Sequence, residues 1–191
     1  NIGDMVNLVV IDLYVNEISK LPASMANLDN VEAIYLGSNR ISKVPKALCN
    51  MKELAVLDLG DNQIKKLPKE VDSLQNLQFA FFYENKISKL PQEFGQLKAL
   101  IEIDLSSNRI KKLPSTIGDL KSITELNLDY NKLKKLPEEI VNLKQLESIH
   151  LTANGLQALP DSIGKMQNLM NVTIDENPIE QLPESFFNLR N

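Results

Sequence analysis

The chain has 191 residues with 21 basic and 25 acidic side chains, giving a formal net charge of −4. This balance argues against nucleic acid as a partner, because nucleic-acid-binding proteins carry a basic patch or stripe. No stretch approaches the roughly 18 to 20 consecutive apolar residues of a transmembrane helix, so no membrane span is expected.

One unit of 23 residues is repeated along the chain and is clearest at residues 100–122, LIEIDLSSNRIKKLPSTIGDLKS. A proline follows the asparagine of each unit by six positions, from Pro22 to Pro183. A fixed period of this length predicts a solenoid, in which each repeat packs on its neighbours. The eight asparagines are Asn16, Asn39, Asn62, Asn85, Asn108, Asn131, Asn154 and Asn177.

Each unit predicts a short strand, a turn and a short helical segment, in that order. Ile103 and Leu105 are two residues apart, so in an extended chain they point to one face while the polar residues around them point to the other. After Asn108, apolar residues recur about every three positions. That spacing suits a 3₁₀ or α segment that begins at a proline.

Seven positions in each unit are apolar, and all 56 of them hold Leu, Ile, Val, Met, Phe or Ala. Stacked repeats would bury these side chains in one continuous core. Parallel strands lie about 4.8 Å apart, whereas packed helices need about 8–10 Å, so the stack should curve with its strands on the concave side. One strand position should form a buried row, which contains Ile11, Ile34, Leu57, Ile103, Leu126, Ile149 and Val172.

The repeated asparagine has a structural explanation. A tight turn buried between coils leaves N–H and C=O groups unpaired, and a side-chain amide can donate and accept at once. We therefore expect the eight amides to form a ladder along the stack. Repeat 4 departs from the pattern, with Ala80 and Phe82 at the inward positions of its strand, an exchange of a small and a large side chain that conserves volume.

The pattern L-x-x-L-x-L-x-x-N-x-I-x-x-L-P-x-x-I-x-x-L-x-x resembles the leucine-rich repeat family. Its L-P-x-x-I form is similar to the intracellular Ras-group scaffold proteins and to scribble and erbin. The resemblance covers residues 1–191 as a single array and implies an α/β solenoid, a curved horseshoe that binds protein partners in intracellular signalling. The chain starts and ends within a repeat, so a fragment of a longer protein is expected. Extracellular members often carry disulfide-bonded caps, which the lone Cys49 cannot form, so a cytoplasmic location is favoured.

The predicted concave face is acidic. Its forty outward positions carry twelve carboxylates and no lysine or arginine, so this face holds −12 and the rest of the chain +8. Six of the ten aromatic residues also face it, and exposed aromatic residues cluster at binding sites. We expect a groove that is apolar and then acidic, for a protein partner with apolar and basic residues. The alternative is a merely solvated polar face. The candidate binding residues are Tyr35, Phe79, Phe81, Tyr83, Glu102, Asp104, Glu125, Asp129, Tyr130 and His150.

A band of lysines follows the asparagines by four residues, on the flank away from the groove. Such a ladder could meet an anionic surface or phosphates. Long lysine stems that cover apolar flanks explain it as well, and we favour this passive role. The band contains Lys20, Lys43, Lys66, Lys89, Lys112 and Lys135.

Catalysis is not expected. His150 and Ser148 are two residues apart on a strand, so their side chains should lie roughly 6–7 Å apart, too far for proton transfer. The acidic cluster could hold a hard cation, but no loop surrounds it to complete the ligands. We predict no metal, no cofactor and no small-molecule substrate. A regulatory segment of a larger kinase, phosphatase or GTPase, and a bacterial surface or secreted adhesin, remain as alternatives.

Overall fold

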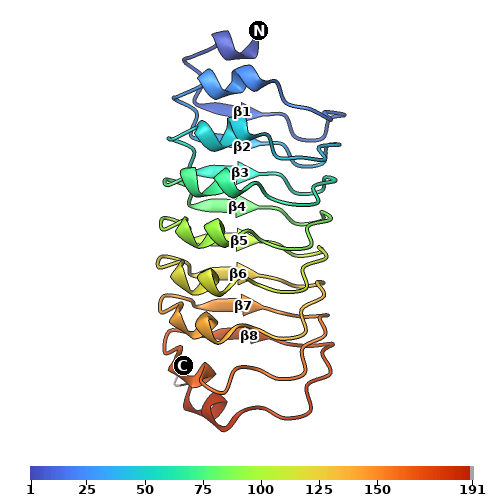
Figure 1. The fold of residues 1–191 in the computed structure, drawn as a ribbon, viewed down its shortest axis with the longest axis vertical. Coiled ribbons are helices and arrows are strands. Elements are labelled where there is room, and N and C mark those ends of the chain that lie inside the picture. Colours follow the sequence, from blue (N-terminus) through green and yellow to red (C-terminus); the bar gives the residue numbers. More distant parts are fainter. Residues whose placement is uncertain (190–191) are drawn as a thin grey trace.

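The computed structural model describes residues 1–189, so the last two positions of the predicted array, residues 190 and 191, lie outside the described residues. The chain forms one stack of coils with a single parallel sheet, ordered β1 to β8 as in the sequence (Figure 1). The strands are β1 Val10–Asp12, β2 Ala33–Tyr35, β3 Val56–Asp58, β4 Phe79–Phe81, β5 Glu102–Asp104, β6 Glu125–Asn127, β7 Ser148–His150 and β8 Asn171–Thr173.

The return segments are all 3₁₀ helices within the described residues, so the 3₁₀ alternative is the one observed. Pro114 immediately precedes its helix with an extended ψ of 151°, so the proline directs the chain into the helix rather than occupying its first turn. The helices are η1 Ile2–Asp4, η2 Ala23–Asn27, η3 Lys46–Asn50, η4 Lys69–Ser73, η5 Gln92–Gln96, η6 Ser115–Asp119, η7 Glu138–Asn142, η8 Ile163–Lys165 and η9 Glu184–Asn188.

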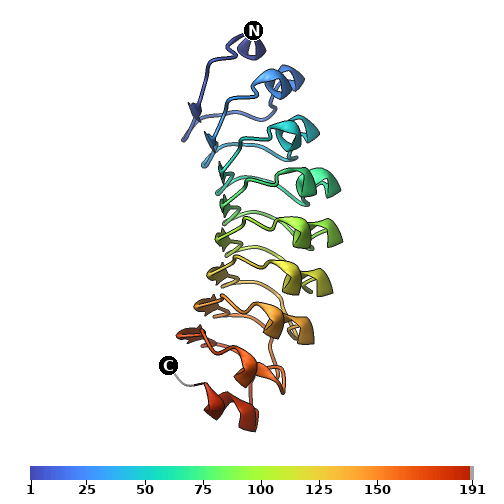
Figure 2. The same ribbon diagram turned by 90° about the vertical axis from the view of Figure 1, so that its left-hand side faces the viewer.

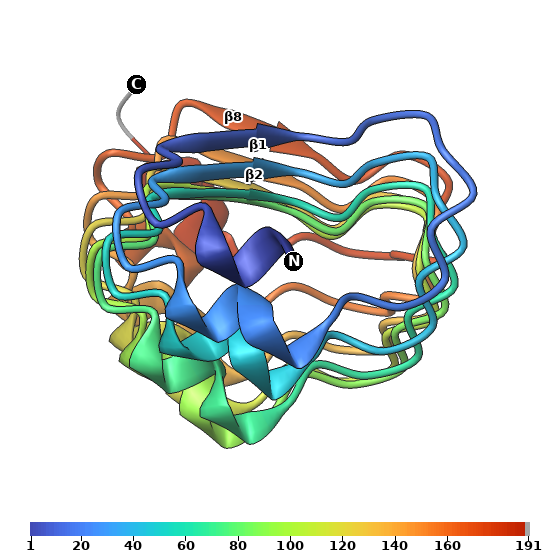
Figure 3. The same ribbon diagram turned by 90° about the horizontal axis from the view of Figure 1, so that it is seen from above.

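The strands and helices lie on opposite sides of the stack. In Figure 2 the column of strands is curved, and its concave side faces away from the helices. Seen along the stack, the coils superpose around a common interior (Figure 3). The predicted curvature, with a concave sheet and a convex helical side, is therefore observed.

The strands pair in register, so equivalent positions of successive repeats form rows. Ile103 lies between Ala80 and Leu126, and all three are fully buried. Phe82 is 1% exposed, which confirms that Ala80 and Phe82 exchange volumes inside the core. Val172 is in the predicted row but only half-buried, because β8 is the last strand of the sheet.

The asparagine ladder is present, and each amide bonds to backbone groups rather than to other amides. The Asn108 Nδ2 donates to the carbonyl oxygens of Phe82, Leu105 and Ser106, and its Oδ1 accepts from the Ile87 N–H. One amide therefore ties two neighbouring coils together. The ladder is buried from Asn39 to Asn131, half-buried at Asn154 and Asn177, and exposed at Asn16.

The residue before each asparagine adopts a left-handed conformation, with φ between 47° and 55° and no glycine among the eight. L-residues pay roughly 1–2 kcal/mol for this conformation, so the turn needs an outside restraint. The asparagine amide supplies it, because its Nδ2 bonds to the two carbonyls that precede the left-handed residue.

Cys49 lies in η3, on the convex side of the stack. The residue is 1% exposed, and burial, followed by the charges of Glu70 and Asp72, raises the pKa of its thiol to about 11. The thiol is therefore unreactive at neutral pH. Gly118 occupies the same position in a later repeat, where a Cβ would collide with the carbonyl oxygen of Glu139, so glycine there lets adjacent helices approach closely.

Candidate functional site

The centre of the concave face joins an apolar strand to an acidic one. The register places Phe79 of β4 between Val56 and Glu102. It places Phe81 between Asp58 and Asp104. Both phenylalanines are half-buried, so each leaves part of its ring on the surface. The predicted junction of aromatic and acidic residues therefore exists at β4 and β5.

The acidic side of this junction contains two directly opposed glutamates, Glu102 and Glu125, on neighbouring strands. Burial raises the pKa of the Glu102 carboxyl, and the charges of Glu125 and Asp104 raise it further. Like charges that face each other across a parallel sheet reduce stability. Within residues 1–189, lysine and arginine form ion pairs only at Arg40 with Glu17 and at Lys46 with Glu70, so no lysine or arginine compensates this pair, and the basic side chain nearest to it is His150, 3.9 Å from Glu125.

Other carboxylates of the face have structural partners, which the sequence reasoning missed. The Ser106 N–H donates to Asp104 Oδ1 at 2.8 Å, and the Thr152 N–H donates to Asp129 Oδ1 at 2.6 Å. The Gly60 N–H makes the equivalent bond to Asp58 Oδ1 at 2.8 Å. The signal was present in the sequence, because Asp12, Asp58, Asp104 and Asn127 recur four residues before the asparagine, and each accepts the N–H two residues ahead. Asp104 and Asp129 therefore stabilise the turns that follow the strands.

A pair of tyrosines spans the first four repeats. A Cβ at Gly37 would collide with the Tyr14 ring, and a Cβ at Gly60 would collide with the Tyr83 ring. The Tyr14 ring therefore lies over Gly37 of the next repeat, and the Tyr83 ring lies over Gly60 of the preceding repeat. Burial, followed by a hydrogen bond with Tyr14 and the nearby charge of Asp58, raises the pKa of Tyr83 above its ordinary value.

This contact changes the interpretation of Tyr83. Four strands at about 4.8 Å spacing place the two tyrosine positions roughly 14 Å apart, a gap that two side chains reaching toward each other close. Tyr83, predicted as a binding residue, is already engaged in contacts within the molecule. Tyr35 is half-buried between Asp12 and Asp58, and Tyr130 is 57% exposed. Tyr130 is therefore the freer ring.

His150 is not brought to Ser148. Its Nδ1 lies 3.3 Å from Thr173 Oγ1, and its Nε2 lies 3.9 Å from Glu125 Oε1. The Ser148 hydroxyl instead accepts a hydrogen bond from Asn171 Nδ2. The geometry that a nucleophile and its base require is absent at this pair, and His150 instead lies beside Glu125 of the acidic cluster.

Within residues 1–189, no cluster of three or more His, Cys, Asp or Glu side chains is arranged to hold a metal ion. In the same residues, no helix has the length and apolar composition to cross a membrane.

Comparison with known proteins supports the family resemblance. Residues 83–133 match the leucine-rich repeat family model. No curated protein matches the sequence of the chain significantly. A leucine-rich repeat protein of Leptospira interrogans has a similar structure, with a TM-score of 0.95 and 35% sequence identity over 98% of this chain. The match covers 48% of that protein, so this chain spans about half its length.

Two further solved structures are similar over most of this chain. The ectodomain of a membrane receptor kinase from Arabidopsis thaliana, in complex with Casparian Strip Integrity Factor 2, has a TM-score of 0.81 and 28% identity over 91% of this chain and 21% of its own. Internalin C2 of Listeria monocytogenes has a TM-score of 0.87 and 19% identity over 99% of this chain and 80% of its own, a likeness of fold alone. The 23-residue period, the parallel sheet with 3₁₀ returns and the family match together identify the chain as an array of leucine-rich repeats.

Proposed function

We propose that the chain is a protein-binding scaffold and that its partner lies in the concave groove across β4 to β6. The observation that carries the proposal is the opposed pair Glu102 and Glu125, which has no lysine or arginine partner and lies beside the half-buried rings of Phe79 and Phe81. Opposed like charges cost stability, and an acidic surface without counter-charge attracts a basic partner. The residues thus serve a bound molecule better than they serve the fold.

The partner that fits is a protein segment with both apolar and basic side chains. Apolar groups of that segment would cover Phe79 and Phe81, where burial of aromatic surface supplies most of the binding free energy. Lysine or arginine groups would lie against Glu102 and Glu125, steering the encounter and fixing its orientation. Tyr130 follows β6 in the same repeat as Glu125, and His150 lies on β7 of the next repeat, so both extend the same surface.

The similarity to the plant receptor ectodomain is consistent with this use of the fold. That structure is a complex with Casparian Strip Integrity Factor 2 and is 28% identical to this chain. Since the match covers 21% of the receptor ectodomain, its partner is not transferred to this chain. That structure is an example of a similar solenoid bound to another molecule.

Two cellular settings are proposed on the basis of resemblance. The L-P-x-x-I repeat and the lone Cys49 favour a cytoplasmic scaffold in intracellular signalling, as in Ras-group and scribble-like proteins. The second candidate is a bacterial surface or secreted adhesin, and what supports it is that a 35% identical leucine-rich repeat protein comes from a bacterium, Leptospira interrogans. In both settings the same groove would bind the partner, and no catalytic step is assigned to the chain.

Selection from a peptide display library tests the groove while the natural partner is still unidentified. Extended peptides that mix basic and apolar residues should be selected by the chain, and Phe81→Ala should weaken their binding by about 2 kcal/mol, roughly 30-fold. Phe187→Ala is the matched control, because Phe187 is 76% exposed on η9, outside the groove. Equal binding by the Phe81 variant and the wild-type chain would refute the site.

The charged residues need a different measurement. Glu102→Gln with Glu125→Gln should mainly slow association, and the effect should fade as added salt shortens the Debye length. Glu138→Gln with Glu139→Gln removes the same charge from η7 and serves as the control. These pairs are preferable to substitution of Asp104, whose carboxylate also accepts a backbone hydrogen bond. Loss of peptide binding in variants of the lysine band alone would move the binding site to the flank.

A further inference from the structure

One flank of the solenoid carries ten basic residues and no acidic ones over four repeats. They lie in the stretches that connect each asparagine turn to the following helix in repeats 3 to 6, and we call this surface the basic flank. In repeat 1 the same stretch contains Glu17, and in repeat 8 it contains Glu180. The basic flank consists of Lys65, Lys66, Lys86, Lys89, Arg109, Lys111, Lys112, Lys132, Lys134 and Lys135.

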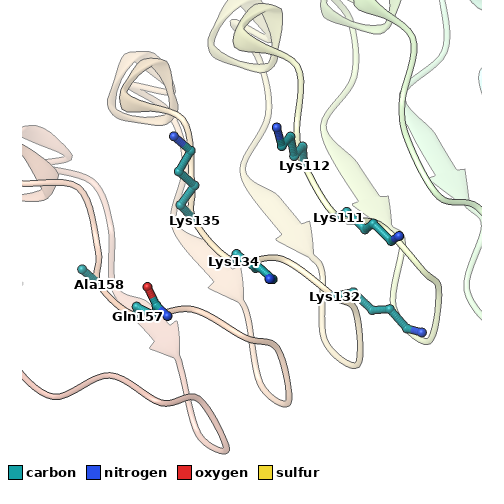
Figure 4. Close-up of a pocket in the computed structure, with 7 residues that line it drawn as sticks. All are labelled: Lys111, Lys112, Lys132, Lys134, Lys135, Gln157 and Ala158. Carbon is teal, nitrogen blue, oxygen red and sulfur yellow. The ribbon is translucent and has the colours of Figure 1, made fainter.

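The C-terminal part of the basic flank is hollowed into a pocket of about 730 Å³. The lysines come from the connecting stretches of two adjacent repeats, and the third repeat closes the pocket with two small or polar residues (Figure 4). Ligand pockets typically enclose about 300–1,000 Å³, so this one suits a compact molecule. The lining residues are Lys111, Lys112, Lys132, Lys134, Lys135, Gln157 and Ala158.

The five ammonium groups of the pocket have no partner within residues 1–189. None of them takes part in an ion pair or a side-chain hydrogen bond there. Lysines on the helical side behave differently, since Lys98, Lys121 and Lys144 each donate to a carbonyl oxygen at the end of a 3₁₀ helix. The pocket lysines are therefore not used to cap backbone groups.

Repeats 1 and 2 show how this flank looks when its charge is compensated. Arg40 lies one residue after its asparagine, and its Nη2 donates to Glu17 Oε1 of the preceding repeat at 2.7 Å. Arg109 and Lys132 occupy the same repeat position near the pocket, and the sequence offers them no such glutamate. One lysine per repeat is enough to cover apolar surface with its aliphatic stem. Repeat 6, however, contributes three lysines to the pocket.

We infer that this pocket binds a compact molecule bearing several phosphate groups. Lysine is a point-charge donor suited to phosphate oxygens. The five lysines that line this hollow bring five positive charges together without a carboxylate among the lining residues, so an entering anion would reduce their mutual repulsion. A ring that carries several phosphates matches both the charge and the size of the pocket. That chemistry occurs in free organic polyphosphates and in the headgroups of phosphorylated inositol lipids.

The test uses inositol hexakisphosphate as the probe and isothermal titration calorimetry at about 0.15 M salt, where the Debye length is near 8 Å. Lys112→Gln with Lys135→Gln should weaken its binding roughly tenfold or more. Lys20→Gln with Lys43→Gln is the matched control, because it removes the same charge from the same repeat positions outside the pocket. Inorganic phosphate should bind far more weakly than the probe to the wild-type chain.

Vesicles distinguish the two sources of the phosphates. Flotation with vesicles that contain phosphatidylinositol bisphosphate, compared with phosphatidylserine vesicles of equal charge, tests the lipid headgroup. Preference for the bisphosphate vesicles would identify the headgroup as a ligand, and binding of the soluble probe alone would identify a free polyphosphate. Equal weakening in the pocket variant and the control would reveal general charge attraction and overturn the site, as would failure of the wild-type chain to bind either probe.

Discussion

Replacement of Asn108 by leucine tests the ladder on which the stack depends. The Asn108 side chain is 7% exposed and makes four hydrogen bonds to backbone groups. Leucine has nearly the same size but can neither donate nor accept. The cost of the substitution therefore depends on which backbone groups lose their last partner.

Three of the four backbone groups keep another partner. The Phe82 oxygen still accepts from Asn85 Nδ2, and the Leu105 oxygen still accepts from Asn131 Nδ2. The Ser106 oxygen still accepts from the N–H of Glu84. Only the Ile87 N–H, whose partner is Asn108 Oδ1, is left unsatisfied in the interior. An unsatisfied buried donor costs about 1–3 kcal/mol, and each lost bond to a paired carbonyl adds a fraction of the usual value of about 1 kcal/mol. The expected loss is about 3 kcal/mol.

Asn16→Leu is the matched control at the same repeat position. Asn16 is exposed, its Nδ2 donates only to the carbonyls of its own turn, and the Leu13 oxygen also accepts from Asn39 Nδ2. Its loss should cost less than about 1 kcal/mol. Urea unfolding followed by circular dichroism measures both, and hydrogen exchange at the Ile87 N–H locates the defect. Equal destabilisation by the two substitutions would refute the reasoning, because it would mean that bridging between coils adds nothing.

Three other substitutions test the concave side. Glu102→Gln should raise the free energy of unfolding at pH 7 by about 0.5 kcal/mol. Because the pKa of Glu102 is raised in the folded state, the wild-type chain loses stability as this carboxyl ionises with rising pH. The stability difference between variant and wild type, measured in thermal melts, should therefore vanish near pH 3, where the carboxyl is protonated. Gly60→Ala should displace the Tyr83 ring and lower the pKa found by ultraviolet titration of the tyrosines; an unchanged titration would contradict the tyrosine pair. Val15→Asn should stabilise the chain by about 1 kcal/mol in urea unfolding, since Val15 is 67% exposed at a φ of 53° and asparagine tolerates that conformation; a loss of stability would count against strain at this turn.

The sequence predicted the fold because its period defines every row of the core. Once repeats stack in register, Ile103 must lie between its counterparts, and Ala80 and Phe82 can be assigned to the interior from their positions alone. The same periodic reasoning predicted a buried asparagine ladder. It could not say which backbone groups each amide bonds, because that depends on the distance between coils.

Contacts that break the 23-residue period could not be predicted from the repeat pattern alone. The pairing of Tyr14 with Tyr83 crosses two intervening repeats and depends on the absence of side chains at Gly37 and Gly60. All four residues share one repeat position, two before the asparagine, so the two glycines between two tyrosines were the available signal. The role of Asp104 as a turn acceptor does not follow from the charge of the concave face, because it depends on a local hydrogen bond to the Ser106 N–H.

The separation of charge in repeats 5 and 6 is difficult to explain by stability alone. Glu102 and Glu125 face each other on the sheet, while five lysines of the same two repeats surround a pocket on the flank. Neighbouring repeats of this fold can compensate each other's charge, as the Arg40 and Glu17 ion pair demonstrates one residue after the asparagine. Exposed ion pairs of that kind contribute at most about 1 kcal/mol, so their absence costs the fold little stability. An acidic surface on the sheet and a basic surface on the flank, in contrast, each attract ligands of the opposite charge. This separation of charge is what the two proposed binding surfaces require, an acidic groove for basic side chains and a basic pocket for phosphate groups.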